Sequence, residues 1–504
     1  MKGNLFATIA DRITDASRPF LFTQGGAVFS YGDMLDASAR YANALASLGV
    51  KAGDRVAVQT EKHVDSVWLY LACLRKGAVY LPLNPAYTPA EVAYFVSDAE
   101  PALLVCESRS VDTLRAIIGG SSSRIETLDG AGDGSLQTLA KTMPSQFETV
   151  DAGADDLAAI LYTSGTTGRS KGAMITHENL RSNALALADI WQFTAGDVLL
   201  HALPIFHTHG LFVAMNTVML SGSSMIFMPR FDLEAVMAAL PAATTMMGVP
   251  TFYTRLLSDA RFDRDAASHM RLFVSGSAPL SAETHRAFTA RTGHAILERY
   301  GMTETNMITS NPHDGERRPG AVGFPLPGVS VRIADPETGK ALPEGGIGVI
   351  ELKGPNVFKG YWRMPEKTAQ EFRADGWFIT GDLGYIDPDG YVTISGRAKD
   401  LIISGGFNVY PAEVENALDA LPMIGESAVI GLPHADFGEA VTAVVTARGG
   451  SEVDESAVRA QLESALAKFK IPKRVLVKDS LPRNAMGKVQ KNALREEYAK
   501  LYSI

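Results

Sequence analysis

Apolar runs of strand length recur through the first 250 residues of the chain. They lie at 56–59, 103–106, 157–161 and 224–228, and amphipathic stretches of helical spacing lie between them. One helix start is marked by Thr88-Pro89-Ala90-Glu91, where a capping hydroxyl, a first-turn proline and a following glutamate form a capping box. The alternation predicts an α/β fold, with layers of helices on substantially parallel sheets.

The pattern changes at about residue 320. From there to residue 396, short Val- and Ile-rich runs such as 329–333 and 348–352 are separated by Gly and Pro. Such spacing is typical of strands joined by tight turns. We therefore expect a small antiparallel or barrel-like part at the end of the large domain.

A domain boundary is predicted near Lys399 and Asp400. The segments beyond it indicate a compact α+β unit, and they are 411–418, 426–430, 439–446 and 455–467. We expect an N-terminal domain over 1–398 and a C-terminal domain over 399–504.

An uncharged run from Gly210 to Pro229 is long enough to span a bilayer. It contains Asn216, Thr217 and the turn-like segment 221–224. We interpret it as helix, turn and strand of a soluble core, not as a membrane span. Residues 1–13 lack a long apolar segment before a small-residue cleavage site, so we expect no signal peptide.

Composition is that of an ordinary globular protein, because 46% of the 504 residues are hydrophobic and 20% are charged. A formal net charge of −9 argues against a general binder of nucleic acids or anionic membranes. Cys73 and Cys106 lie in apolar patterns and are interpreted as small core residues. We expect a cytoplasmic protein, with no nucleic-acid partner and no membrane partner.

One basic run departs from the acidic average. Between Lys468 and Lys491, eight Lys and Arg residues accompany a single acid, Asp479. Such a run is usually a solvated surface. Here we favour the interpretation that it faces anionic nucleotides.

The strand predicted at 157–161 leads into a glycine-rich loop. Residues 162–172 read Tyr-Thr-Ser-Gly-Thr-Thr-Gly-Arg-Ser-Lys-Gly, so backbone amides, five hydroxyls, Arg169 and Lys171 surround one point. That combination suits a polyphosphate. The loop is not a Walker loop, because Ser170 stands where that pattern requires Gly. A Ser/Thr/Gly-rich linker is the alternative.

Three further motifs accompany this loop. Residues 298–305 read Glu-Arg-Tyr-Gly-Met-Thr-Glu-Thr, residues 376–382 read Gly-Trp-Phe-Ile-Thr-Gly-Asp with Gly-Arg-Ala-Lys-Asp at 396–400, and residues 482–488 read Pro-Arg-Asn-Ala-Met-Gly-Lys. Together they resemble the adenylate-forming superfamily of acyl-CoA synthetases, luciferases and peptide-synthetase adenylation domains. The resemblance runs from about residue 29 to 492, in the family's order and spacing.

This resemblance implies a two-step reaction. A carboxylate attacks the α-phosphorus of ATP to give an acyl-adenylate and pyrophosphate, and a thiol then displaces AMP to give a thioester. It also implies a small, mobile C-terminal domain with a hinge at Lys399. Because both steps move anionic charge, positioned cations and donors should carry most of the catalysis.

The resemblance also assigns the nucleotide site. The glycine-rich loop would hold the β- and γ-phosphates, Thr303 would donate to the α-phosphate, and Glu304 would hold Mg²⁺. Tyr300 would line the adenine, and Asp382 with Arg397 would hold the ribose, although a structural Asp–Arg pair is the alternative. The full set of expected nucleotide-binding residues is Thr163, Ser164, Gly165, Thr166, Thr167, Gly168, Lys171, Ser277, Ala278, Glu298, Tyr300, Gly301, Met302, Thr303, Asp382, Arg397 and Lys488.

Lys488 matches the family lysine that bridges the incoming carboxylate and the α-phosphate. A shared ammonium offsets the repulsion between these two anions, whereas most lysines near a C-terminus are merely solvated. With Thr303, Glu304 and His207 it makes up the expected catalytic set. Since this lysine is often reversibly acetylated in the family, a lysine acetyltransferase and a deacetylase acting on Lys488 are expected partners.

The loop Ser404-Gly405-Gly406 follows the hinge. Consecutive glycines let backbone pass close to an extended ligand, and in the family this loop lines the pantetheine tunnel. We therefore expect CoA to bind there. A simple turn before the helix predicted at 411 is the alternative.

Arg299 distinguishes the expected acid pocket. In the superfamily the residue before the motif tyrosine lines this pocket and is commonly small, and the same matching adds His207, Ser275 and Met307. A guanidinium there suits a substrate with a second carboxylate, and its bulk leaves room only for a short diacid. The chain looks like the bacterial malonyl-CoA synthetases, so malonate or its 2-methyl derivative is expected. Alternatively, Arg299 pairs with an acid such as Glu298 and points away.

Other functions were weighed against this one. A ligase for short or medium monocarboxylates is the second interpretation within the class. A luciferase-like enzyme and a carrier-loading adenylation domain come from other classes, but nothing indicates a luciferin-sized aromatic pocket or a carrier module. An inactive adenylate sensor is disfavoured because Glu304, Asp382, Arg397 and Lys488 are all present.

Overall fold

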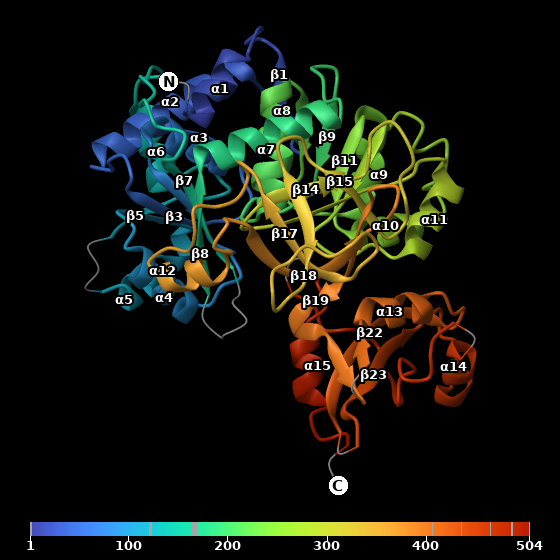
Figure 1. Cartoon of the computed structure of the whole chain (residues 1–504). Helices are drawn as coiled ribbons and strands as arrows, with labels where there is room; N and C mark the ends of the chain where they lie inside the picture. The colour runs from blue at the N-terminus through green and yellow to red at the C-terminus, as the bar shows by residue number, and fades with distance from the viewer. Residues whose placement is uncertain are drawn as a thin grey trace.

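The computed structural model describes residues 3–119, 123–163, 170–405, 407–434, 436–463, 465–484 and 487–502. Two sheets build a large N-terminal part, and a third builds the smaller C-terminal part that lies below it in Figure 1. This arrangement confirms the predicted fold class of layered α/β sheets followed by a small α+β domain. The mobility of that domain and its boundary at 398/399 stay predictions.

The first sheet has six strands, in the order β6-β5-β3-β4-β7-β8. Its neighbouring strands pair in parallel, except that β8 runs antiparallel to β7. The strands are β3 (Arg55–Gln59), β4 (Val79–Pro82), β5 (Leu103–Cys106), β6 (Arg124–Thr127), β7 (Leu157–Thr163) and β8 (Lys171–Thr176). Three of the predicted apolar runs are thus strands, and the glycine-rich loop follows the carboxyl end of β7.

Helices alternate with these strands along the chain: α2 (Tyr31–Ser47), α3 (Val64–Lys76), α4 (Pro89–Ala99), η1 (Ser108–Ser110), α5 (Val111–Ile117) and α6 (Ser135–Thr142). The capping box predicted for α4 is present, because the N–H groups of Thr88 and Glu91 each donate to the other's side chain. Cys73 and Cys106 are fully buried and form no disulfide, as predicted for small core residues.

The second sheet is a path of 13 strands, and its half from β13 through β12, β11, β9 and β10 to β1 is parallel. The strands of this half and its antiparallel edge strand are β1 (Pro19–Thr23), β2 (Val28–Ser30), β9 (Val198–His201), β10 (Ser224–Phe227), β11 (Thr245–Gly248), β12 (Leu272–Ser275) and β13 (Leu297–Met302). The accompanying helices are α1 (Leu5–Asp11), α7 (His177–Ile190), α8 (Asn216–Ser221), α9 (Leu233–Ala239), η3 (Leu240–Ala242), α10 (Pro250–Leu257) and α11 (Ala282–Thr292).

The other half of this sheet is antiparallel, which is one of the two forms expected for residues 320–396. Its elements are β14 (Asn306–Ser310), β15 (Ala321–Pro325), β16 (Ser330–Ala334), β17 (Gly348–Lys353), α12 (Pro365–Gln370), β18 (Phe378–Ile386) and β19 (Val392–Arg397). Pairing of β14 with both β13 and β15 joins the two halves.

The uncharged run from Gly210 to Pro229 has the predicted order of helix, turn and strand. A π-helix (His209–Met215) leads into α8, Gly222 at φ +67° ends that helix, and β10 follows. The left-handed conformation at residue 222 is one that glycine adopts without strain. Within the described ranges, no helix combines the length and the apolar character that a membrane crossing requires.

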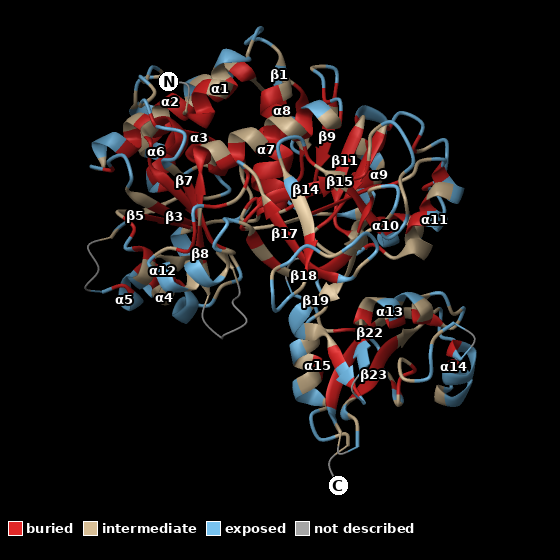
Figure 2. Cartoon of the chain, viewed as in Figure 1, coloured by how far each residue is buried: buried red, intermediate tan, exposed pale blue. Residues whose placement is uncertain are grey.

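The C-terminal part packs helices on a sheet in which β22 and β23 form a long hairpin. Its elements are η4 (Ala398–Asp400), β20 (Ile402–Ser404), β21 (Phe407–Val409), α13 (Pro411–Asp419), β22 (Ile424–His434), β23 (Gly438–Ala447), α14 (Glu455–Leu462), β24 (Arg474–Val477) and α15 (Lys491–Glu497). Figure 2 shows the sheets as the buried centre of both parts, with exposed residues on the outer helix faces.

That the basic run 468–491 faces anionic nucleotides stays a prediction, and most of its charge is paired within the protein. Five of its cations form ion pairs with glutamates of the same domain: Lys470 with Glu413, Arg474 with Glu455, Lys478 with Glu497, Arg483 with Glu426 and Lys491 with Glu415. These acids lie outside the run in the sequence, on other elements, so the local charge count missed them.

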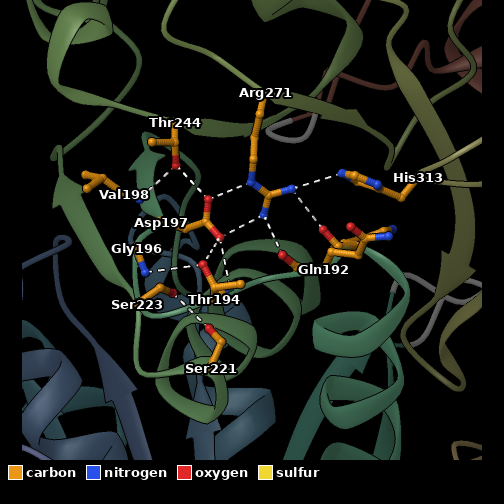
Figure 3. A network of polar contacts seen from close by, with 11 residues as sticks. Gln192, Thr194, Gly196, Asp197, Val198, Ser221, Ser223, Thr244, Arg271 and His313 are labelled. Atoms are coloured by element: carbon orange, nitrogen blue, oxygen red, sulfur yellow. Dashed lines mark hydrogen bonds and ion pairs between the residues drawn. The ribbon is translucent and has the colours of Figure 1, made fainter.

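A partly buried ion pair joins the amino ends of three neighbouring parallel strands (Figure 3). Arg271 directly precedes β12, and its Nε and Nη2 donate to the two carboxylate oxygens of Asp197, before β9, at 2.6 and 2.8 Å. Thr244, before β11, donates to the same carboxylate at 2.9 Å. Burial alone would raise the pKa of Asp197, but the hydrogen bonds from Arg271, Thr194 and Thr244 hold this pKa below its ordinary value.

We predict that Asp197→Asn lowers the free energy of unfolding by about 2 kcal/mol at pH 7. Breaking a fully buried pair costs roughly 3–5 kcal/mol, and the loss here is smaller because the Arg271 side chain is 30% exposed. Since the folded-state pKa is lowered, the contribution is present above the unfolded pKa and is lost as pH falls through the folded one. Denaturant unfolding at pH 7 and below pH 4 measures both effects.

The exposed pair of Arg261 and Glu234 serves as the control. Glu234→Gln should leave the unfolding midpoint unchanged, because solvent screens exposed pairs. Equal loss of stability in the two variants, or no pH dependence of the Asp197→Asn effect, would contradict the assigned role of Asp197.

Candidate active site

The predicted site residues gather at the edge where the parallel strands of the large sheet end. The strands β9, β11, β12 and β13 run parallel to one another, so their last residues, His201, Gly248, Ser275 and Met302, lie at the same edge. Ligands of α/β sheets bind at such carboxyl edges. The ion pair of Asp197 and Arg271, which we expect to stabilise the fold, lies at the opposite, amino edge, away from the candidate site.

Arg299 lies in β13 with only 4% of its surface exposed. A Cβ on Gly276 would lie 2.3 Å from Arg299 Cζ, so the guanidinium packs directly on the Gly276 backbone. Its Nε and Nη2 are buried and have no hydrogen-bond partner among the described residues. Desolvation lowers the pKa of Arg299 to about 9, which leaves the side chain charged at neutral pH.

The alternative that Arg299 pairs with Glu298 is wrong. Successive side chains of a strand point to opposite faces, and the Glu298 carboxylate accepts a hydrogen bond from the Gly320 N–H at 3.1 Å instead. Burial raises the pKa of Glu298 to about 8. Among the described residues, no carboxylate bonds to Nε or Nη2 of this guanidinium.

Other buried polar atoms of the candidate site are also unpaired. The Oγ of Ser275 and the Nε2 of His209 are buried and lack a partner in the part of the chain that the structure describes. Desolvation, and then the positive charge of Arg299, lower the pKa of His209, so its imidazole is neutral. Met307 packs beside Gly301, two residues after Arg299 in β13, since its Cε lies 2.6 Å from the place of a Cβ on Gly301.

His209 was not predicted as a site residue. Its Nδ1 lies 3.1 Å from Ser277 Oγ, which connects it to one of the predicted nucleotide residues. The sequence His207-Thr208-His209 offered a signal, because it places two imidazoles in one loop, but the burial that leaves Nε2 without a partner is a property of the fold.

Three predicted nucleotide residues from distant segments meet at one carboxylate. The Tyr300 hydroxyl donates to Asp382 Oδ2, and Arg397 Nε lies 2.8 Å from Asp382 Oδ1. The attraction of Asp382 raises the pKa of Arg397. The structural pair that was the alternative is thus present, while binding of the ribose by the same residues stays a prediction.

Thr303 and Glu304 lie in the turn between β13 and β14. Glu304 is 6% exposed, and burial raises the pKa of its carboxyl. Among the described residues, no cluster of three or more His, Cys, Asp or Glu side chains forms a metal site. A single carboxylate nevertheless fits Mg²⁺, which binds in such sites through one or two carboxylates, phosphate oxygens and water.

Lys488 comes from the C-terminal domain and reaches the same region. Desolvation, followed by repulsion from Arg397, lowers the pKa of Lys488, and Asp382 opposes this shift. Its side chain is exposed in part, and its charged neighbours Arg397, Asp382, Arg299 and Glu304 place it at the candidate site. Desolvation and then the charge of Lys488 lower the pKa of His207 to about 4, which places His207 near Lys488.

A second contact holds the C-terminal domain against the large domain. Arg448, directly after β23, donates through both Nη atoms to the two carboxylate oxygens of Glu283 in α11. The Arg448 Nε also donates to the Ile424 carbonyl within its own domain, at 2.9 Å. This pair and Lys488 place the C-terminal domain across the carboxyl edge of the sheet.

Several predicted residues are not tested by these contacts. Ser164, Gly165, Thr166, Thr167, Gly168 and Gly406 lie outside the described residues, whereas Thr163 ends β7. Ser404 and Gly405 contact Gly438 and Phe437 of the same domain. Lys399 lies exposed in η4, between the two domains. Binding of CoA and the hinge function stay predictions.

The comparisons with known proteins agree with this geometry. A family model described as AMP-binding enzyme matches residues 13–362, and a second one, described as AMP-binding enzyme C-terminal domain, matches residues 413–488. The chain belongs to the AMP-binding enzyme family. Matches of this extent confirm the resemblance to the adenylate-forming superfamily.

Three proteins illustrate the similarity. The crystal structure of ATP-bound MatB from Rhodopseudomonas palustris is 59% identical over 100% of both chains, with a TM-score of 0.98. A malonate–CoA ligase from Arabidopsis thaliana is 36% identical over 88% of this chain and 78% of its own length. A feruloyl-CoA synthase from Amycolatopsis sp is also 36% identical, over 94% of this chain and 95% of its own.

For this AMP-binding enzyme we predict that Lys488 reacts with acetic anhydride faster than Lys478 does. The pKa of Lys488 is lowered, whereas the ion pair with Glu497 raises the pKa of Lys478. At a given pH near neutrality, Lys488 therefore holds more of the reactive free amine. Mass spectrometry of peptides after brief labelling gives both rates, and equal or slower labelling of Lys488 would contradict the lowered pKa of this lysine.

Proposed function

We propose that this chain is an AMP-forming ligase that joins malonate to CoA through a malonyl-adenylate. The observation that carries the proposal is the guanidinium of Arg299, which is buried and charged and whose Nε and Nη2 have no partner among the described residues. An unpaired buried charge is strongly unfavourable. A substrate that brings its own anion into the pocket removes this penalty.

Malonate fits the remaining features of the pocket. Its distal carboxylate would accept from Nε and Nη2 of Arg299, which are buried without a partner among the described residues. The two carboxylates are separated by a single methylene, which suits a pocket narrowed by Arg299 and Met307. A 2-methyl substituent on this acid stays within the proposal.

A monocarboxylate suits the pocket less well. Butyrate or ferulate would bury an apolar group against the guanidinium and leave both nitrogens unpaired. Identity of 36% to both a malonate ligase and a feruloyl-CoA synthase does not distinguish the acids. Identity of 59% to ATP-bound MatB over the whole chain supports the nucleotide as well as the adenylate-forming reaction.

The residues of the candidate site would carry adenylation. Lys488 would lie between the reacting carboxylate of malonate and the α-phosphate of ATP, where its ammonium reduces their repulsion. Thr303 would donate to the same phosphate, and Asp382 with Arg397 would orient the ribose. Held by Glu304, Mg²⁺ would neutralise phosphate charge.

The thioester step would use CoA at Ser404, Gly405 and Gly406 after rotation about Lys399. Such a rotation would break the pair of Arg448 and Glu283 and withdraw Lys488 from the candidate site. Acetylation of Lys488 would remove the charge that adenylation needs. A cytoplasmic location and the acetylating partners stay predictions.

We predict that Arg299→Ala lowers kcat/KM for malonate by roughly two to four decades, because truncating one partner of a buried charge pair costs about 3–5 kcal/mol. For butyrate, kcat/KM should hold steady or rise, since the change removes an unpaired cation and opens apolar space. Assays of pyrophosphate release with the two acids give the informative quantity, which is the ratio of kcat/KM for malonate to kcat/KM for butyrate.

Arg317→Met is the matched control. Arg317 carries a half-buried guanidinium, and it donates to the backbone carbonyls of residues 295, 312 and 313. Replacing Arg317 should change kcat/KM for malonate and kcat/KM for butyrate by the same factor. A parallel drop for malonate and butyrate in Arg299→Ala would mean that Arg299 serves folding, and the dicarboxylate proposal would fail.

A further inference from the structure

One aromatic side chain touches two groups that were predicted to meet the polyphosphate. The Tyr361 hydroxyl donates to Glu304 Oε1 at 2.9 Å, and Lys171 Nζ lies 4.1 Å over the centre of the Tyr361 ring. Glu304 is the proposed Mg²⁺ ligand, and Lys171 belongs to the glycine-rich loop and begins β8. Tyr361 was not predicted from the sequence.

The backbone around Tyr361 is fixed against the strand that follows this loop. Residues 359–362 form backbone hydrogen bonds with β8. The N–H of residue 359 donates to the Met174 carbonyl at 2.9 Å, and the N–H of residue 362 donates to the Gly172 carbonyl at 2.7 Å. Tyr361 N–H itself donates to Thr368 Oγ1 at 2.8 Å. The ring is only 3% exposed, so packing and hydrogen bonds together hold it in one place.

The Lys171 ammonium has one further described contact. Glu371 Oε1 lies 3.7 Å from Lys171 Nζ and 2.8 Å from Lys367 Nζ, so this carboxylate is shared between two cations. The Lys171 side chain is 12% exposed. An ammonium held over an aromatic ring is stabilised chiefly by electrostatics, and it keeps N–H donors that are free to turn toward a phosphate.

We propose that Tyr361 is a positioning residue for the metal-bound nucleotide. Its hydroxyl orients the Glu304 carboxylate, and its ring holds the Lys171 ammonium beside that carboxylate. The group that would hold the metal and the cation at the end of the loop are thus fixed relative to each other before the nucleotide arrives. The inference rests on the proposed nucleotide site but not on the identity of the acid.

Two substitutions separate the role of the Tyr361 hydroxyl, which contacts Glu304, from the role of the ring, which contacts Lys171. Tyr361→Phe removes only the hydroxyl and keeps the ring under Lys171. Tyr361→Leu removes both the hydroxyl and the ring. Tyr31→Phe is the matched control, because Tyr31 is equally buried and donates to the Ser223 carbonyl at 2.7 Å, yet it contacts neither Glu304 nor Lys171.

The test is binding of Mn²⁺ to the full chain with ATP, followed by electron paramagnetic resonance in the absence of any acid, together with ATP binding in EDTA by calorimetry. Loss of a group that orients a metal ligand typically costs about 10–100-fold in metal affinity. We expect Tyr361→Phe to weaken Mn²⁺ binding by that factor and to leave the affinity for metal-free ATP unchanged. Tyr361→Leu should weaken both Mn²⁺ binding and metal-free ATP binding, and Tyr31→Phe should change neither.

A merely structural role predicts another result. Tyr361→Phe would then lower the thermal unfolding midpoint as Tyr31→Phe does, with unchanged Mn²⁺ affinity, and this outcome would overturn the proposal. Failure of the parent chain to bind Mn²⁺ with ATP would overturn the proposed nucleotide site as well. Because no acid is present, an error in the malonate assignment would leave the expected results as they are.

Discussion

The guanidinium of Arg299 sets the central constraint on the site. It is buried, charged at neutral pH and packed on the Gly276 backbone, and its Nε and Nη2 have no partner in the described part of the chain. A fold that maintained this arrangement without a ligand would keep an uncompensated charge in its interior. A ligand that brings an anion to Arg299 removes this cost, so the site should favour anionic ligands over neutral ones.

The two edges of the parallel sheet differ in how their buried polar groups are paired. At the amino edge, Asp197 and Arg271 join three strands in a saturated network, whereas at the carboxyl edge Ser275, His209 and Arg299 are left unsaturated. Buried polar groups without partners are rare in folded proteins and need a specific explanation. We interpret the unpaired atoms at the carboxyl edge as substrate ligands, whereas the network of Asp197 and Arg271 contributes stability at the amino edge.

Sequence patterns predicted the element types well because those depend on local spacing. Apolar runs became strands, the capping box at Thr88 became the start of α4, and the motifs placed Tyr300, Asp382 and Arg397 in one cluster. Contacts that depend on which distant segments pair were beyond local patterns. The contact of Tyr361 with Glu304 requires residues 359–362 to lie along β8, and no spacing in the sequence encodes that pairing.

The most direct measurement is a crystal structure of the chain with malonate and a non-hydrolysable ATP analogue. The account predicts that the distal carboxylate of malonate lies within about 3 Å of both Nε and Nη2 of Arg299, the geometry of a charge-assisted bidentate contact. The other carboxylate should lie between Lys488 and the α-phosphate. A distal carboxylate bound elsewhere, with Arg299 unpaired or turned to a protein acid, would contradict the account.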